Sequence, residues 1–448
     1  MRKLKKFPYQ SVLVLGLAKS GTAVAKLLNR NGIKTIVNDL KAVESDAHVQ
    51  ELQNLGMEII LGEHPLSLLD GIDVIIKNPG IPYENPLVRQ ATEQGLPVLT
   101  EIELLYYFEL DSLVGITGSN GKTTTTTLIY EMYKQDRRKV EVAGNIGLVA
   151  SEVAETIEDG AALVVELSSF QLLGTQCFKP SISVVLNLFE AHLDYHHTLD
   201  HYMEAKSNIF KNQSTGDFLV YNADDQLVEL MVQQAETNLV PFSTNEQLDN
   251  GTYSDGIALY YKNEKIIEIE KIALVGEHNI ENILAAIAVA KLEGISNEAI
   301  KSVLTTFTGV SHRLQFVDNI EGRLFYNDSK ATNILATSKA LQSFQQPTIL
   351  LAGGLDRGNE FDDLTPYLKN VKSFVLFGET APKLKALAEK IGLESIVTVN
   401  NMEEAVKEAF KLSEEGDVIL LSPACASWDQ YKTFEERGNM FVESVHKL

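Results

Sequence analysis

The segment Leu113-Val-Gly-Ile-Thr-Gly-Ser-Asn-Gly-Lys-Thr-Thr124 joins a short apolar run, a glycine-bearing turn and the start of a helical pattern. A strand that enters a helix through such a turn gathers backbone N–H groups around an anion, and the helix N-terminus adds partial positive charge. In that arrangement Lys122 reaches the outer phosphates of a nucleotide, and the Thr123 hydroxyl is a ligand for Mg²⁺. The segment therefore predicts a phosphate-binding loop in an α/β domain.

The glycine spacing of this loop departs from the strict pattern, which requires glycine where this chain has Ile116. The match is to the shorter pattern Thr-Gly-x-x-Gly-Lys-Thr, and an accidental Gly-Lys-Thr turn is the alternative interpretation. Strand, turn and helix each fall where phosphate binding needs them, which favours the loop.

Glu166 ends a neighbouring apolar run and is our candidate metal ligand. The alternative is an ordinary solvent carboxylate that closes a strand.

Short apolar runs alternate with helical patterns on both sides of the loop, which is typical of a doubly wound α/β fold. The predicted strands form three series: 12–15, 35–37, 58–61, 73–76 and 97–99; 113–116, 162–165, 182–186 and 218–221; and 348–351, 373–377, 396–399 and 417–421. A hairpin is predicted at 257–269 and a buried helix at 278–293. We therefore expect three α/β domains, with bounds 1–101, 102–309 and 310–448.

Composition limits the class of protein. The chain has 448 residues, 44% hydrophobic and 22% charged, and a length of this kind suits about two to four globular domains. Its 39 basic and 61 acidic residues give a net charge of −22, which argues against nucleic acid or anionic lipid as a partner.

Cys177 and Cys425 lie far apart and form no disulfide framework, so a reducing cytoplasm fits best. No apolar run reaches the ~18 residues of a membrane span, and 12–15 is expected to be a buried strand rather than part of a signal peptide.

Four histidines, His192, His196, His197 and His201, crowd together with Asp194 among them. A zinc-dependent hydrolase is one interpretation of this cluster. The cluster lacks the His-Glu-x-x-His pattern, however, and a phosphate loop needs an oxygen-preferring Mg²⁺ rather than zinc. We expect one working histidine, His192, directly after the predicted strand 182–186 and its loop, and we expect the other three to be solvated loop residues.

A weaker nucleotide signal lies near the start of the chain, in Gly16-Leu-Ala-Lys-Ser-Gly21, with Asp39 at the end of the next predicted strand. The pattern is close to the Gly-x-Gly-x-x-Gly turn of dinucleotide-binding domains, but Ala18 replaces the glycine that admits a pyrophosphate most closely. A different nucleotide, or one bound less closely, is the interpretation that we favour. A tight βα turn with no ligand is the alternative.

Taken together, segments along essentially the whole chain resemble the Mur ligases. The matching segments are 117–124, 144–147, 166–171, 276–282, 312–313, 327–333 and 421–438. Residues 327–333 and 421–438 resemble the branch of the family that adds D-glutamate rather than its sister branches. The resemblance implies an α/β fold in three domains: a Rossmann-like N-terminal domain, a P-loop central ATPase domain and a Rossmann-like C-terminal domain.

The resemblance also implies roles for individual residues. Catalytic roles would fall on Lys122, Glu166, His192 and Lys206. ATP would be held by Gly118, Ser119, Asn120, Gly121, Lys122, Thr123, Thr124, Asn279, Asn282, Arg313 and Asp328. Metal would be held by Thr123, Glu166, His192 and a carbamylated Lys206. The nucleotide-sugar would contact Ala18, Lys19, Ser20, Gly21, Asp39, Asn78, Pro79, Gly80, Asn145, Ser168 and Gln171. D-Glutamate would contact Lys330, Thr332, Arg357, Ser427 and Phe434, where Arg357 replaces the lysine of some family members.

By this resemblance the chain would join D-glutamate to UDP-N-acetylmuramoyl-L-alanine through an acyl phosphate, releasing ADP and phosphate. The reaction would use ATP and two Mg²⁺ ions and would belong to cytoplasmic peptidoglycan synthesis, which serves cell-wall formation, cell shape and cell division. We expect a monomer with no nucleic-acid partner and no membrane insertion. A folylpolyglutamate synthetase-like ligase of the same superfamily is the first alternative, although it gives no reason for the first α/β block. A regulatory GTPase is another alternative, but residues 187–190 lack the lysine and aspartate that a guanine-binding segment would use.

Overall fold

The computed structural model describes the whole chain except residues 191, 192 and 277, and it also leaves out the side chains of residues 193 and 194. The chain divides into two compact units, Met1–Phe307 and Thr308–Leu448, which we call unit 1 and unit 2. Unit 1 contains two sheets and unit 2 contains one. No helix within the described residues is both long and apolar enough to cross a membrane.

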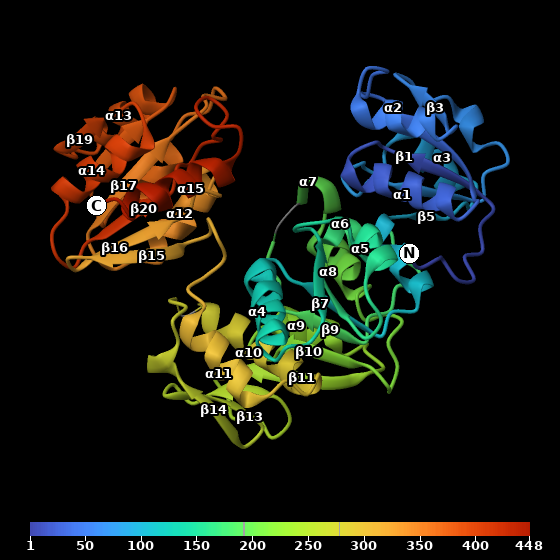
Figure 1. The fold of residues 1–448 in the computed structure, drawn as a ribbon, viewed down its shortest axis with the longest axis horizontal. Helices are drawn as coiled ribbons and strands as arrows, with labels where there is room; N and C mark the ends of the chain where they lie inside the picture. Colours follow the sequence, from blue (N-terminus) through green and yellow to red (C-terminus); the bar gives the residue numbers. More distant parts are fainter. Residues whose placement is uncertain (191–192, 277) are drawn as a thin grey trace. The chain divides into compact units, whose positions relative to one another are not determined.

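The first sheet of unit 1 is parallel and has the strand order β3-β2-β1-β4-β5 (Figure 1, blue). Its strands are β1 (Ser11–Leu15), β2 (Lys34–Asp39), β3 (Glu58–Leu61), β4 (Val74–Lys77) and β5 (Val98–Leu99). Its helices are α1 (Lys19–Arg30), α2 (Ala47–Asn54), η1 (Leu66–Leu69) and α3 (Pro86–Glu93). Successive residues of β1 point to opposite faces, so Val12 and Val14 pack with α1 and α2, while Leu13 and Leu15 pack with η1 and α3.

The second sheet of unit 1 has the order β14-β13-β12-β11-β10-β9-β6-β8-β7 and is parallel from β7 to β12. Its strands are β6 (Ser112–Thr117), β7 (Val140–Gly144), β8 (Ala162–Glu166), β9 (Ile182–Val185), β10 (Phe218–Asn222), β11 (Asn238–Ser243), β12 (Thr252–Ser254), β13 (Ala258–Tyr261) and β14 (Glu264–Glu268). The helices around it are η2 (Glu101–Phe108), α4 (Lys122–Gln135), α5 (Ala150–Thr156), α6 (Ser169–Leu172), α7 (Leu193–His196), α8 (Leu199–Ser207), α9 (Gln226–Val232), η3 (Ile269–Lys271), α10 (His278–Leu292) and α11 (Asn297–Thr306). Helices α4, α10 and α11 cover one face, and α5 and α8 pack on the other.

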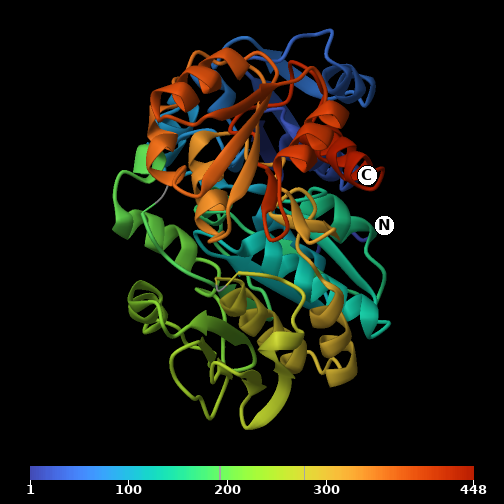
Figure 2. The ribbon, with the colours of Figure 1, turned by 90° about the vertical axis from the view of Figure 1, so that its left-hand side faces the viewer.

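The sheet of unit 2 has the order β15-β16-β20-β17-β18-β19 and is parallel except for β15 (Figure 2, orange and red). Its strands are β15 (Gln315–Ile320), β16 (Arg323–Asn327), β17 (Thr348–Gly353), β18 (Val371–Phe377), β19 (Ser395–Thr398) and β20 (Val418–Leu421). Its helices are α12 (Ile334–Gln342), η4 (Asp362–Tyr367), α13 (Ala381–Lys390), α14 (Met402–Leu412) and α15 (Phe434–Val445). Helices α12 and α13 pack on one face, and α14 and α15 pack on the other.

The predicted strands, the hairpin of β13 and β14 and the buried helix α10 are confirmed, with ends shifted by a residue or two. Strand 12–15 is fully buried, as predicted. The sequence reading omitted β7, β11, β12 and the hairpin of β15 and β16. In β15, Asp318 and Asn319 interrupt the apolar pattern and the strand is only half-buried at the sheet edge, so it lacks the hydrophobic run that marks the central strands.

A buried carboxyl at the start of η2 makes the stability of unit 1 depend on pH. Burial raises the pKa of Glu101 to about 7, against the opposing hydrogen bond from the Ser151 N–H. Because the folded pKa of Glu101 lies above its unfolded value, the folded state binds the Glu101 proton more tightly than the unfolded state does. The resulting contribution to the unfolding free energy is complete below about pH 4.5 and is lost as the pH rises through about 7.

We expect Glu101→Gln, which is neutral throughout, to remove about 3 kcal/mol of the fall in unfolding free energy between roughly pH 5 and 8. Urea unfolding at several pH values measures this, with Glu93→Gln on the exposed face of α3 as the matched control. An unchanged pH dependence in Glu101→Gln would contradict the assignment.

Candidate active site

The turn between β6 and α4 is built as a phosphate cradle. Gly118 and Gly121 have φ values of +155° and +83°, a region that favours glycine. A Cβ atom at Gly121 would clash with Asn282 Oδ1, so a side chain there would have to displace the Asn282 amide. Lys122 Nζ folds back and donates to the carbonyl oxygens of Gly118 (2.9 Å) and Ser119 (3.1 Å). The cradle and its lysine are thus in place around the start of α4.

Glu166 lies next to this cradle, because β8 and β6 are neighbours in the sheet. Its carboxylate is 1% exposed and accepts hydrogen bonds from Thr123 Oγ1 (2.8 Å) and Asn145 Nδ2 (2.9 Å). A hydroxyl oxygen and a carboxylate beside a phosphate cradle are the donors that Mg²⁺ prefers. The residues present therefore fit a magnesium ion, with Thr123 and Glu166 as the ligands that the chain offers.

Lys206, on α8, reaches the same cradle from the other side. It is 1% exposed, and its Nζ donates to Gly118 O (2.8 Å) and Thr117 Oγ1 (3.3 Å), with the Tyr202 ring 4.7 Å away. Burial, followed by the charge of Lys122, holds the pKa of Lys206 well below its ordinary value. A lysine amine reacts with CO₂ only in its neutral form, so this environment fits a carbamate. No local sequence signal marks the position, and only the family resemblance had pointed to it.

The start of α10 carries the polar groups expected at the adenine side. Asn279 and Asn282 are buried, and Asn282 Nδ2 donates to Asn279 Oδ1 (3.0 Å). The hydroxyl of Thr125 on α4 donates to Asn282 Oδ1 at 3.4 Å. Helix α10 is therefore tied to the first turns of α4 through Asn282, a residue of the predicted ATP set, and Thr125, which is outside that set.

The histidine cluster departs from the prediction at His196 and His201. His192 lies outside the described residues. His196 was expected in solvent, but it is 0% exposed; its Nε2 contacts Ser169 Oγ (2.9 Å) and its ring stacks on Phe170. Helix α7 places it against α6, where the aromatic rings exclude water. His197 is exposed, as predicted, while His201 is half-buried and its Nδ1 lies 3.0 Å from His196 O.

Across the side chains of residues 1–190, 195–276 and 278–448, His, Cys, Asp and Glu form no group of three or more that could hold a metal ion. His192 and the side chain of Asp194 lie outside these ranges. The oxygen donors beside the cradle remain the candidate metal ligands.

The glycine turn after β1 is held by the carboxylate of Asp39. Burial raises the pKa of Asp39, but hydrogen bonds from the backbone N–H groups of Leu17, Ala42 and Lys41 outweigh it and leave the pKa below its usual value. Gly21, on the first turn of α1, has no space for a side chain, because a Cβ atom would meet Gly16 O at 1.8 Å. This tight turn leaves the N-terminus of α1, where Ala18 gives no side-chain cap, as a place for an anion.

A second loop of the predicted nucleotide-sugar set meets this turn. Asn78 Nδ2 donates to Ser20 Oγ (3.0 Å), and Asn78 Oδ1 accepts from the Gly80 N–H (3.1 Å). The loops after β1 and β4 are adjacent because these strands pair in the sheet. Ser168 and Gln171 form a capping box with each other at the N-terminus of α6.

In unit 2, Asp328 lies buried at the end of β16. Burial raises its pKa to about 7, although hydrogen bonds from Ser422 Oγ (2.8 Å) and the Leu314 N–H (3.2 Å) oppose the shift. The positive charge of Arg313 also opposes the rise in the pKa of Asp328. The flanking residues His312 and Leu314 have φ values of +65° and +42°, so the backbone on both sides of Arg313 lies in the left-handed region, which non-glycine residues rarely adopt.

Unit 2 also contains a cavity of about 530 Å³. Its lining includes Thr332 and Arg357, and Arg357 is the one basic side chain among the described residues that line it. Nearby, Ser427 Oγ is buried and has no hydrogen-bond partner among the described residues, and Lys330 Nζ lies 5.4 Å from the centre of the Phe434 ring. Of the five predicted D-glutamate residues, Thr332 and Arg357 line this cavity, and Ser427 directly follows its lining residue Ala426.

Arg437, on α15, is a residue that sequence reasoning missed. Its guanidinium is fully buried and donates to Ser329 O (2.9 Å), Cys425 O (3.0 Å) and Gly353 O (3.4 Å). These three carbonyls belong to the loops that carry Thr332, Ser427 and Arg357. Arg437 therefore ties together the loops around the cavity, a role that only the tertiary structure reveals.

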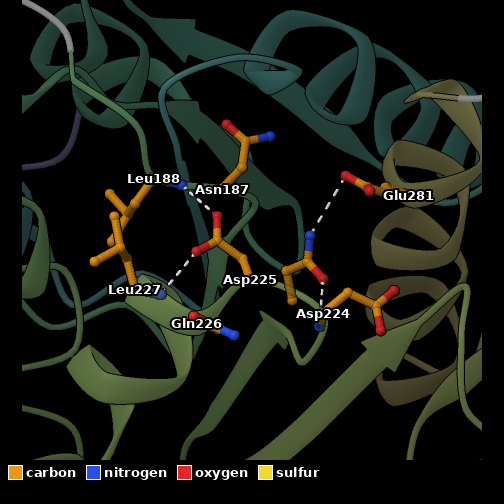
Figure 3. A pocket seen from close by; sticks show the side chains of 8 residues that line it. Asn187, Leu188, Asp224, Asp225, Gln226, Leu227 and Glu281 are labelled. Atoms are coloured by element: carbon orange, nitrogen blue, oxygen red, sulfur yellow. Dashed lines mark hydrogen bonds between the residues drawn. The ribbon is translucent and has the colours of Figure 1, made fainter.

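A second pocket, of about 430 Å³, lies beyond the carboxyl ends of β9 and β10 in unit 1 (Figure 3). Asp225 in its wall accepts hydrogen bonds from the N–H groups of Leu188 (2.8 Å) and Leu227 (2.9 Å). Burial, followed by the charges of Asp224 and Asp225, raises the pKa of Glu281. An acidic wall repels phosphate, so this pocket does not suit the phosphates of a nucleotide.

Family models match three segments that together cover most of the chain. Residues 10–100 match the model for the N-terminal domain of Mur ligases of the MurD-like type, residues 116–290 match the Mur ligase middle domain, and residues 312–425 match the glutamate ligase domain of Mur ligases.

Two relatives cover nearly the full length. The chain is 56% identical to UDP-N-acetylmuramoylalanine--D-glutamate ligase of Bacillus subtilis, over 98% of both chains. It is 57% identical to the protein of the same name in Geobacillus kaustophilus, over 100% of both chains. Among solved structures, MurF ligase from Thermotoga maritima in complex with ADP has a TM-score of 0.56 at 19% identity, over 97% of this chain and 95% of that one. At this identity the match shows the shared fold.

Proposed function

This chain belongs to the Mur ligase family, and from that premise we propose that it joins D-glutamate to UDP-N-acetylmuramoyl-L-alanine with cleavage of ATP to ADP and phosphate. The near full-length identity to two D-glutamate ligases supports this substrate pair. The reaction would be a step of peptidoglycan precursor synthesis in the bacterial cytoplasm.

The observation that carries the proposal is the convergence of Lys122, Thr123, Glu166 and Lys206 on one phosphate cradle. In the proposed reaction the muramoyl-alanine carboxylate takes the γ-phosphoryl group of ATP, which gives an acyl phosphate and ADP. The amine of D-glutamate then attacks the acyl carbon, and phosphate leaves as the amide forms. The chain need supply no nucleophile, so its task is positioning and charge stabilisation.

Within this reaction Lys122 neutralises charge on the outer phosphates while two anions approach each other. Mg²⁺ held by Thr123 and Glu166 would supply further positive charge at the transferring phosphoryl group. We also propose that Lys206 carries a carbamate, which would turn a buried base into an oxygen ligand for a second metal ion. His192 would complete the metal set. The buried amides Asn279 and Asn282 would hold the base of ATP.

The remaining substrates have their own loops. We propose that the nucleotide-sugar lies on the turn Ala18–Gly21 with Lys19 and Ser20, near Asp39 and the loop Asn78–Gly80. Asn145, Ser168 and Gln171 would contact its sugar end. D-Glutamate would lie in the cavity of unit 2 with Lys330, Thr332, Arg357, Ser427 and Phe434, and Arg313 and Asp328 would hold ATP.

We keep as proposals the three-domain division at residues 101 and 309 and the monomeric state. The match of residues 10–100 to a Mur ligase N-terminal domain, which contains the sheet of β1 to β5, favours this function over the folylpolyglutamate synthetase-like alternative.

Phosphate release from ATP tests the proposal. With UDP-N-acetylmuramoyl-L-alanine, D-glutamate and Mg²⁺ all present we expect release, and omission of any one should abolish it. L-Glutamate in place of D-glutamate is the control. Release that is indifferent to the stereochemistry, or that is absent with all components, would sink the proposed function.

A further inference from the structure

The cavity of unit 2 has an aromatic neighbour outside the set of proposed substrate residues. Trp428, next to Ser427, is 65% exposed, and its ring lies 4.8 Å from the Arg357 guanidinium carbon. It is the single tryptophan of the 448-residue chain. A large aromatic side chain held in solvent beside a cavity calls for an explanation other than core packing.

The backbone sets this pair up. The Leu355 N–H donates to Ala426 O (2.9 Å), and Arg357 and Trp428 each lie two residues beyond that bond. Arg437 fixes the same two loops through Gly353 O and Cys425 O. The two side chains are thus brought together by a bond between their own loops.

Among the described residues Arg357 forms no ion pair with a carboxylate, although Asp363 also lines the cavity. Its neighbour Asp356 accepts from the Gly358 N–H and pairs with Lys383 (3.1 Å). A guanidinium stacked on an aromatic face keeps its N–H donors in its own plane, where a planar carboxylate can accept two of them. The guanidinium carbon lies over the Trp428 ring, so the contact restrains this group and leaves its N–H donors available.

We infer that Trp428 is a positioning residue for Arg357, fixing the plane of its guanidinium so that it binds a carboxylate of the incoming amino acid. This inference rests on the proposed function, since it takes the cavity of unit 2 as the D-glutamate site. It explains why arginine serves here where some family members carry lysine: an aromatic face orients a planar guanidinium but gives an ammonium group no such fixed plane.

The kinetic test compares Trp428→Leu, which removes the ring, with Trp428→Phe, which keeps a smaller one. We expect Trp428→Leu to raise KM for D-glutamate roughly two- to five-fold, the size expected for one exposed cation–π contact. Trp428→Phe should lie between it and the parent, and KM for ATP and for the nucleotide-sugar should not change. Ile391→Ala, at an exposed apolar side chain of the same unit, is the matched control.

A binding readout uses the single tryptophan. In the full chain with a non-hydrolysable ATP analogue and the nucleotide-sugar, D-glutamate should change Trp428 fluorescence saturably, L-glutamate should not, and Arg357→Gln should abolish the response. An unchanged KM for D-glutamate in Trp428→Leu, or an equal rise for all three substrates, would overturn the inference. If the parent shows no D-glutamate-dependent phosphate release, the proposed function itself fails, which is a separate result.

Discussion

Lys122→Ala is expected to abolish measurable phosphate release, with a loss of at least about 1,000-fold in kcat, or ~4 kcal/mol of transition-state stabilisation. The reason is that Lys122 is the cation of the cradle, and its Nζ already lies 2.9 Å from Gly118 O at the turn that would hold the phosphates. Without it, two anionic reactants approach with less compensating charge. Coupled phosphate-release kinetics at saturating substrates measure the loss.

The matched control is Lys134→Ala, on the same helix α4 but on its exposed last turn. It removes one lysine charge and changes little else, so its activity should equal that of the parent. A Lys122→Ala variant that keeps more than about a tenth of the parent rate would contradict the role of the loop as the ATP site.

Lys206→Ala is expected to lower kcat by about 100-fold or more, the usual scale for loss of a positioned charged group at a transferring phosphoryl. The distinguishing result is rescue. A short carboxylate such as formate or acetate should restore part of the activity, because it replaces the carbamate that we propose on the lysine. Steady-state kinetics across a carboxylate titration measure this effect.

Two comparisons sharpen the test of Lys206. Lys206→Arg keeps a positive charge but forms no carbamate, so it should be inactive and should not respond to carboxylates. Lys211→Ala, an exposed lysine just after α8, is the matched control and should behave as the parent. Full activity in Lys206→Ala would refute the carbamate role.

Local patterns account for most of what the sequence predicted. The cradle at Gly118 to Thr123 is read from neighbouring residues, because a strand, a glycine turn and a helix start each leave a local signature. The buried parallel strands are likewise marked by continuous apolar runs such as 12–15 and 418–421.

Properties that arise from tertiary packing were missed. His196 is polar and sits in a polar stretch, yet α6 and its aromatic neighbours bury it. The sequence around Lys206 is that of an ordinary helix lysine, and only the fold places its Nζ against Gly118 O. Arg437 and Trp428 act through loops more than 70 residues away in the sequence, a separation that no local pattern encodes.

In the proposed reaction ATP phosphorylates a carboxylate of the nucleotide-sugar, and the amine of D-glutamate then attacks the acyl carbon and displaces phosphate. The most direct measurement uses UDP-N-acetylmuramoyl-L-alanine labelled with ¹⁸O in both carboxylate oxygens, followed by mass spectrometry of the phosphate and of the product. We expect one ¹⁸O atom in each phosphate released and one retained in a product heavier by one D-glutamate residue. Phosphate without label, or release without this product, would rule out the acyl-phosphate route.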